Sequence, residues 1–174
     1  MLVITLLGVA YVLTANIPLS PQMDQSENVA WFDDYYTIEY IDEKTIAIGE
    51  PRYYQQNYNY LIVGEDKAIL FDTGSGIRKI KPVVGSLTNL PITVISSHLH
   101  YDHIGNHNQF QTVALLDVQE TSERLQSSWF TPTYFEHLGF AEWFKKPNFK
   151  ITERLQNNQR IDLGNRVITV LHTP

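Results

Sequence analysis

The chain has 174 residues, of which 43% are hydrophobic and 18% charged, a composition typical of a globular domain with one core. Its net charge of −6 gives no basic footprint, so we expect no nucleic-acid partner. It contains no cysteine, which excludes disulfides, thiolate metal sites and a cysteine nucleophile.

Residues 1–13 are almost wholly apolar but too short for a membrane span, which needs about 20 residues. They match the apolar part of a secretory signal, with Leu13-Thr14-Ala15 as a cleavage site, although no basic residue precedes them. We therefore predict a signal peptide or short apolar leader over residues 1–15 and export to the periplasm or the medium. The alternatives are a short membrane anchor, which would be the membrane contact, or a buried first strand in a cytoplasmic protein.

Residues 16–30 contain two prolines and little periodicity, so we predict a linker there and a folded domain over residues 31–174. Helices are predicted over residues 75–87, where Pro82 is an expected irregularity, and over residues 118–126. Short apolar, β-branched or alternating runs predict strands over residues 36–41, 44–48, 58–63, 68–71, 92–97, 111–116, 149–155, 160–163 and 166–171. This mixture of hairpins and crossovers predicts a layered α/β fold.

Four potential metal ligands follow the predicted strand over residues 92–97: His98, His100, Asp102 and His103. Side chains two apart in an extended chain point the same way, so the first two histidines can face one point. A turn after them lets Asp102 and His103 reach a second point close by. Nitrogen and carboxylate donors suit borderline divalent cations, so this stretch predicts two metals, zinc above all. The alternative is a set of structural or surface histidines.

The pattern His98-x-His100-x-Asp102-His103 resembles the signature of the metallo-β-lactamase superfamily. A second match is the strand that ends in Asp72-Thr73-Gly74, and the resemblance covers about residues 35–174. It implies an αββα sandwich, in which two sheets pack face to face with helices outside and the metal site lies at the edge. It also implies that Asp72 fixes the metal-binding loop and the ligand tautomers. The alternative for Asp72 is a simple turn or capping aspartate.

The resemblance implies a dinuclear zinc hydrolase that acts on a small-molecule carbonyl substrate, such as a thioester, ester, lactone or lactam. His98 and His100 would hold the first zinc, and Asp102 and His103 the second. A hydroxide shared by the metals would be the nucleophile, with Asp102 orienting it and carrying its proton. Iron or manganese could replace zinc in such a ligand set. The alternative function is a non-catalytic metal-binding or interaction domain of the same fold.

The sequence departs from the family pattern at its end. Family members carry a third histidine ligand as the second histidine of a segment resembling His-Thr-Pro-Gly-His, and a bridging aspartate and a last histidine further on. His172-Thr173-Pro174 matches only the start of that segment, so His172 is not assigned to the metal. We therefore expect the N-terminal portion of an enzyme, truncated at the third metal motif and inactive as a fragment, with an apolar face left exposed.

Several other side chains are weaker candidates. Tyr53 and Tyr54 could contact substrate from a loop beside the metals, or could lie in a solvent-exposed turn. His107 is expected on a polar helix face, and His137 is expected to be structural or exposed. A group of aromatic residues could roof a substrate pocket, although core packing is the favoured interpretation: Trp129, Phe130, Tyr134, Phe135, Phe140, Trp143 and Phe144.

Overall fold

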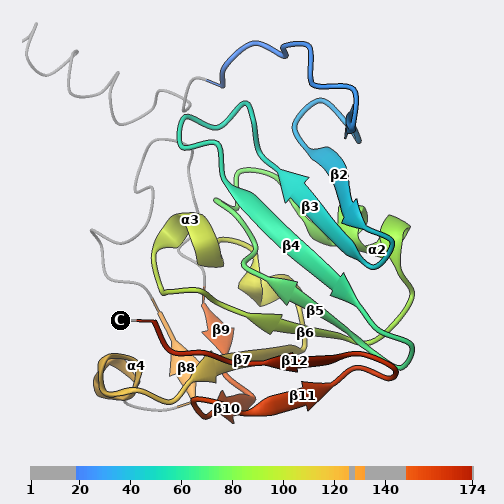
Figure 1. Ribbon diagram of the computed structural model, residues 1–174. Coiled ribbons are helices and arrows are strands. Elements are labelled where there is room, and N and C mark those ends of the chain that lie inside the picture. Colours follow the sequence, from blue (N-terminus) through green and yellow to red (C-terminus); the bar gives the residue numbers. More distant parts are fainter. Residues whose placement is uncertain (1–18, 126–127, 132–147, 174) are drawn as a thin grey trace, which may run out of the picture.

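An eight-stranded mixed sheet forms the centre of the protein, as the computed structural model shows for residues 19–125, 128–131 and 148–173 (Figure 1). The leader predicted over residues 1–15 lies outside these described residues. No helix within the described ranges is long and apolar enough to cross a membrane.

The large sheet has the strand order β1-β2-β3-β4-β5-β6-β7-β10. Its strands are β1 (Val29–Trp31), β2 (Thr37–Asp42), β3 (Thr45–Gly49), β4 (Tyr58–Val63), β5 (Ala68–Phe71), β6 (Ile92–Ile95), β7 (Thr112–Leu116) and β10 (Glu153–Leu155). From β1 to β5 each strand is antiparallel to its neighbour, whereas β5, β6, β7 and β10 pair in parallel. The ends of β5 and β6 therefore lie at the same edge of the sheet, which is where the candidate ligands follow.

Helices and two small sheets complete the fold. The helices are α2 (Lys81–Leu87), α3 (Tyr101–Ile104), the 3-10 turn η1 (His107–Gln109) and α4 (Gln119–Arg124). The small sheets pair β8 (Trp129–Phe130) with β9 (Phe149–Lys150), and β11 (Arg160–Asp162) with β12 (Val167–Thr169).

The large sheet has a hydrophobic core on each face. On one face, Leu61 and Val94 of the sheet pack with Val84 of α2 and Ile104 of α3, and all four are buried. On the other face, Ile69, Ile95 and Leu155 pack with Leu163 of the β11–β12 unit. Helices, a large sheet and a small sheet are thus stacked in the described part of the chain (Figure 1). The predicted α/β layered class is confirmed, and the β11–β12 hairpin lies where the sandwich places its second sheet.

The strands predicted over residues 58–63 and 68–71 agree with β4 and β5 in full. The helix predicted over residues 75–87 is wrong in its first half, because α2 begins only at Lys81. Gly74 and Gly76 adopt positive φ values of 70° and 79°, which a right-handed helix does not allow. Pro82 is no irregularity there, because it lies in the first turn, where its missing N–H is not needed.

Two other expectations change at element boundaries. The predicted linker over residues 16–30 ends in β1, whose Val29 pairs with Glu39, so the sheet begins before residue 31. The turn expected after His100 is a short helix, since α3 begins at Tyr101 and carries two of the candidate ligands.

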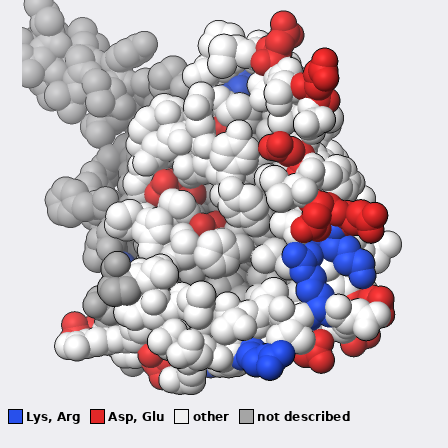
Figure 2. Space-filling model, in the orientation of Figure 1, with Lys and Arg blue, Asp and Glu red and all other residues white. Residues whose placement is uncertain are grey.

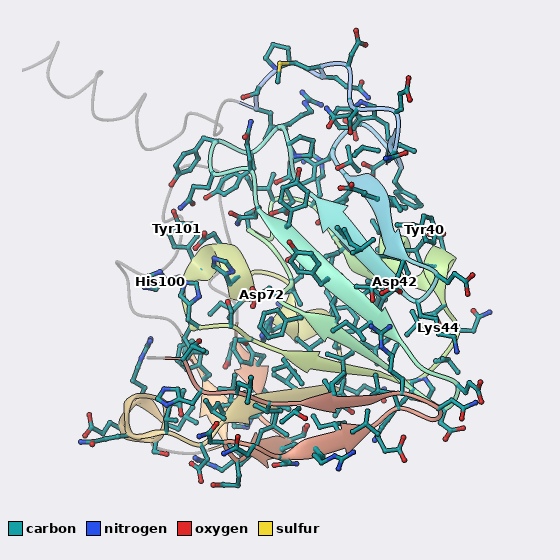
Figure 3. The ribbon with its side chains drawn as sticks, viewed as in Figure 1. Tyr40, Asp42, Lys44, Asp72, His100 and Tyr101 are labelled. Atoms are coloured by element: carbon teal, nitrogen blue, oxygen red, sulfur yellow. The ribbon has the colours of Figure 1, made fainter. Side chains whose placement is uncertain are left out.

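Most of the surface on the side shown in Figure 2 is uncharged. At one edge of it, basic and acidic side chains lie next to one another. Lys44 and Asp42 lie at this edge, as their labels in Figure 3 show in the same view. Ion pairs join Lys44 to Glu65 and Arg166 to Asp42, each at 3.8 Å. Such exposed pairs contribute about 0–1 kcal/mol to stability and form no continuous basic surface on this side.

Gly105 sets how closely α3 can approach the loop after β5. A Cβ on Gly105 would lie 2.3–2.4 Å from backbone atoms of Ser75 and Gly76, which cannot move aside as a side-chain tip could. We therefore predict that Gly105→Ala destabilises the fold by about 1–3 kcal/mol or more in denaturant unfolding. The matched control is Gly85→Ala in α2, where a Cβ meets nothing within 4 Å and should stabilise by about 0.5–1 kcal/mol. Equal effects of the two substitutions would contradict this account of the packing.

Candidate metal centre

The candidate ligands follow β6, and the loop after β5 lies directly against them. Three backbone hydrogen bonds join the two segments: Asp72 N–H to Ile95 C=O at 2.8 Å, Thr73 N–H to His103 C=O at 2.8 Å, and Gly105 N–H to Gly74 C=O at 2.9 Å. These bonds satisfy backbone groups that would otherwise be left without partners at the sheet edge. The position of α3 is therefore fixed by the end of β5.

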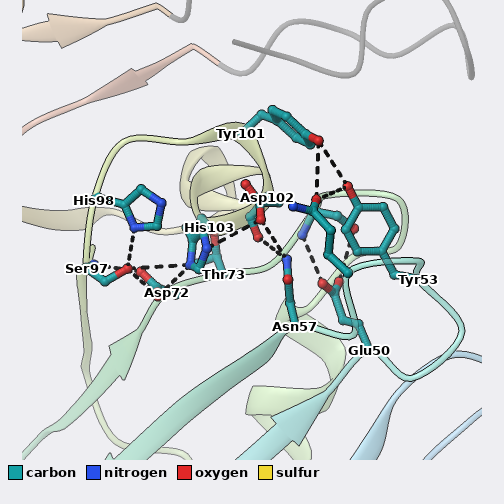
Figure 4. A network of polar contacts seen from close by, with 12 residues as sticks. Glu50, Tyr53, Asn57, Asp72, Thr73, Ser97, His98, Tyr101, Asp102 and His103 are labelled. Atoms are coloured by element: carbon teal, nitrogen blue, oxygen red, sulfur yellow. Dashed lines mark hydrogen bonds and ion pairs between the residues drawn. The ribbon is translucent and has the colours of Figure 1, made fainter.

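The structure brings the three imidazoles into contact. The ring centroid of His98 lies 4.5 Å from that of His100 and 4.1 Å from that of His103. Asp102 Oδ2 lies 3.4 Å from His103 Nε2, on the far side of that ring from Asp72 (Figure 4). His98 and His100 are exposed, whereas Asp102 is buried. All four residues predicted from the motif are therefore gathered at one place.

The donor set fits zinc in its chemistry, since neutral imidazoles and a carboxylate are the ligands this cation takes in proteins. The contacts among these four residues, however, each join only two side chains. Among the described residues, no group of three or more histidine, aspartate or glutamate side chains has the arrangement needed to hold a single metal ion. The metal ligation of these four residues therefore stays a prediction.

Asp72 lies behind the histidines with a positive φ of 64°, an unusual conformation for a residue other than glycine. Its Oδ1 accepts the Ser97 N–H at 2.7 Å, and its Oδ2 accepts the Ser97 hydroxyl at 2.8 Å. His103 Nδ1 lies 2.8 Å from the same Oδ2 (Figure 4). The carboxylate is thus placed against the loop over residues 97–103 and the ring of the candidate ligand His103, as the sequence predicted.

The pKa values of two imidazoles in the cluster are shifted in opposite directions. Partial desolvation of the ring and the neighbouring charges of His103 and His100 lower the pKa of His98. Burial also acts to lower the pKa of His103, but the hydrogen bond and the charge of Asp72 outweigh it and raise that pKa. His98 is therefore the ring that more readily offers an uncharged nitrogen at neutral pH.

Asn57 also contacts the site and was not predicted from the sequence. Its Nδ2 donates to the backbone carbonyl of Asp102 at 2.7 Å and lies 3.4 Å from Asp102 Oδ2 (Figure 4). The two residues are 45 positions apart in sequence, and the isolated asparagine gives no local signal of this contact.

Glu50 is a second residue that the sequence did not reveal. Its carboxyl group is fully buried, where it accepts the N–H of Ser75 at 3.1 Å and the Ser75 hydroxyl at 3.3 Å. Burial raises the pKa of Glu50 from 4.5 to about 8, although both hydrogen bonds act to lower it. Gly74 leaves room for this group, because a Cβ there would lie 2.6 Å from Glu50 Oε1.

The two tyrosines predicted as substrate contacts differ in environment. Tyr53 is fully buried, which excludes a solvent-exposed turn for it, whereas Tyr54 is 63% exposed. The Tyr54 and Tyr101 hydroxyl groups lie 2.9 Å apart, and Tyr53 and Tyr101 both donate to Gln55 Oε1, at 2.9 and 3.3 Å. Tyr101 stands between the candidate ligands His100 and Asp102 in sequence, so the tyrosine cluster borders the candidate site (Figure 3).

The other candidates have structural or peripheral positions. The polar helix face expected for His107 is wrong, because the ring is fully buried, 2.7 Å from Thr73 Oγ1 and 2.5 Å from Ser96 Oγ. Its burial lowers its pKa to about 3. Of the predicted aromatic group, Phe130 is buried in the core and Trp129 is 53% exposed. The remaining members and His137 lie outside the described residues.

Two cavities lie near the candidate ligands, and one of them is lined by two of these residues. One of about 400 Å³ is lined by His98, His100, Thr121 and Arg124, with the exposed His172 at its rim. The other, of about 500 Å³, lies between the large sheet and β12 and has mostly apolar walls. Among the described residues, a small molecule can therefore approach the candidate site on the side of α4.

Comparison with known proteins supports the motif-based interpretation. Residues 53–118 match the family model described as the metallo-beta-lactamase superfamily. The acyl-coenzyme A thioesterases MBLAC2 of Homo sapiens and Bos taurus are each 24% identical over 165 residues, covering 79% of this chain and 59% of the relative. The chain thus spans about three-fifths of the length of these curated relatives.

Solved structures of similar shape show the fold. The class B3 di-zinc metallo-beta-lactamase LRA-12 from an Alaskan soil metagenome aligns with a TM-score of 0.56 and 18% identity, covering 90% of this chain and 58% of that one. A metallo-beta-lactamase from Pontibacter korlensis aligns with a TM-score of 0.52 and 14% identity, covering 76% and 58%.

The buried carboxyl of Glu50 predicts a dependence of stability on pH. Between pH 4.5 and about 8 the folded chain holds a proton that the unfolded chain has released, so this group's contribution falls as pH rises. Glu50→Gln cannot titrate and should remove this loss, which amounts to up to about 1 kcal/mol per pH unit.

Urea unfolding at several pH values in this window measures the slope. The matched control is Glu43→Gln, at an exposed turn position, which should keep the slope of the unmodified protein. If Glu50→Gln loses stability with pH as steeply as that control does, Glu50 is not the proton-holding group.

Proposed function

We propose that this chain belongs to the metallo-beta-lactamase superfamily and that the complete protein functions as a metal-dependent hydrolase of carbonyl compounds. The observation that carries this proposal is the contact among His98, His100 and His103 beside Asp102, with the carboxylate of Asp72 behind them. Imidazoles and a carboxylate gathered at one place are the ligand types that zinc takes in proteins.

Each residue has a defined part in this proposal. His98 and His100 would hold one zinc ion, and Asp102 and His103 the second. The bound ions would supply Lewis-acid chemistry, polarising a substrate carbonyl and lowering the pKa of water. Asp102 would hold and pass a proton at its carboxylate, which Asn57 keeps in place.

The polar rim of the site comes from the tyrosine cluster. Tyr54 is exposed, and its hydroxyl donates to Tyr101, because the single hydroxyl hydrogen of Tyr101 is directed to Gln55. The Tyr54 oxygen can therefore accept a hydrogen bond from a substrate. We therefore assign Tyr54, rather than the buried Tyr53, to contact with polar groups of a substrate.

A thioester is the substrate class we place first, because the curated relatives are acyl-coenzyme A thioesterases. Esters, lactones and lactams share the carbonyl chemistry and remain in the proposal. The metal is proposed as zinc, with iron or manganese as substitutes that metal analysis would distinguish. Export through residues 1–15 also stays a proposal, which the mass of the mature protein tests.

One observation favours a second function. Because no three histidine, aspartate or glutamate side chains among the described residues are arranged to hold one metal ion, the second function we consider is a non-catalytic metal-binding or interaction domain of the same fold. The same observation leads us to propose that this 174-residue chain, assayed alone with zinc, turns over no substrate, since two donors fill only half of a tetrahedral shell.

The decisive test compares metal content and hydrolysis in the complete protein that the gene encodes. We predict zinc-dependent hydrolysis of acyl-coenzyme A thioesters, which the release of free thiol measures. His98→Ala and His103→Ala should each lower kcat/KM by more than about 100-fold, since even residues behind metal ligands contribute 10–100-fold.

The control is Asn108→Ala, an exposed position in η1 next to the cluster, which should keep full activity. Zinc binding without hydrolysis of any thioester, ester, lactone or lactam would favour the non-catalytic function. Activity that survives both histidine substitutions would refute the site itself.

A further inference from the structure

A serine hydroxyl connects two of the candidate ligands through one carboxylate. The Oγ of Ser97 lies 2.8 Å from Asp72 Oδ2 and 2.9 Å from His98 Nδ1. His103 Nδ1 lies 2.8 Å from the same Asp72 Oδ2. These four side chains form a branched hydrogen-bond network, in which Ser97 and Asp72 lie behind the two imidazoles (Figure 4).

The protons of this network can be placed by counting donors and acceptors. An ionised carboxylate only accepts, so Asp72 Oδ2 receives one hydrogen from Ser97 Oγ and one from His103 Nδ1. A hydroxyl group has a single hydrogen, and that of Ser97 is therefore directed to Asp72. Its remaining short contact, with His98 Nδ1, can then only be one in which the hydroxyl oxygen accepts.

The reverse arrangement is unfavourable. If His98 Nδ1 carried no hydrogen, the Ser97 hydroxyl would have to donate to it. The oxygen of Ser97 would then face Asp72 Oδ2 at 2.8 Å with no hydrogen between them. The carboxylate is buried, so this loss of a charge-assisted hydrogen bond would have no compensation from water.

We propose that Ser97 is a positioning residue that holds His98 in the tautomer with hydrogen on Nδ1, as Asp72 does directly for His103. Both neutral rings then present the lone pair of Nε2, the nitrogen available for a cation. One carboxylate thus sets two imidazoles, one by direct contact and one through a hydroxyl. The purpose of this arrangement rests on the proposed metal-dependent function, although the tautomers themselves do not.

The backbone of Ser97 allows the hydroxyl to be tested separately. The Ser97 N–H donates to Asp72 Oδ1 at 2.7 Å, and this bond remains in Ser97→Ala. Ser97→Thr keeps the hydroxyl as well. The matched control is Ser122→Ala in α4, which removes another hydroxyl that donates to a carboxylate at 2.8 Å, that of Asp117.

Long-range 1H–15N correlation spectra of the metal-free chain, recorded well above the histidine pKa values, show which ring nitrogen carries hydrogen. We expect Nδ1 for both His98 and His103 in the unmodified chain, in Ser97→Thr and in Ser122→Ala. In Ser97→Ala, His98 should move toward hydrogen on Nε2, while His103 keeps hydrogen on Nδ1 because its bond to Asp72 is intact.

Zinc affinity, measured by competition with a chromophoric chelator, gives a second readout. Ser97→Ala should weaken zinc binding about 10–100-fold, and the other two variants should leave it unchanged. Hydrogen on Nε2 of His98 in the unmodified chain would overturn the proposal without any variant, as would an unaltered tautomer in Ser97→Ala. Neither measurement uses hydrolysis, so a protein inactive on every carbonyl substrate could still confirm the role of Ser97.

Discussion

The carboxylate of Asp72 is the constraint on which the arrangement of the site depends. It is buried, and a buried carboxylate must be fully hydrogen-bonded to be stable. Its partners are the backbone and side chain of Ser97 and the ring of His103, all on the segment after β6. The need to satisfy one charge therefore brings the end of β5, the first candidate ligand and the last one together.

The sheet makes this constraint effective. Because β5 and β6 are parallel neighbours, their ends leave the sheet at the same edge, and Asp72 N–H bonds to the last residue of β6. The loop then needs positive φ values at Asp72 and at two glycines to turn beneath α3. Glu50 supports the same loop from the core side through Ser75, in a fully buried contact.

The sequence predicted what local patterns encode. The hairpin of β4 and β5 and the gathering of His98 to His103 followed from alternation and spacing. The extent of α2 was not predicted correctly. The residues from 75 onward are compatible with a helix, but the positive φ values of Gly74 and Gly76 could not be read from them. Asn57 and Glu50 were missed because their contacts depend on strand order. His107 was misplaced because its two hydroxyl partners, Thr73 and Ser96, come from loops after different strands.

The central claim is that His98, His100, Asp102 and His103 bind divalent metal. Anomalous diffraction at the zinc absorption edge, from crystals of the complete protein grown with zinc, tests it most directly. The account predicts anomalous peaks within bonding distance, about 2.0–2.2 Å, of the imidazole nitrogens and of the Asp102 carboxylate. Crystals that contain zinc only at other residues, or that show these four side chains without any peak beside them, would contradict it.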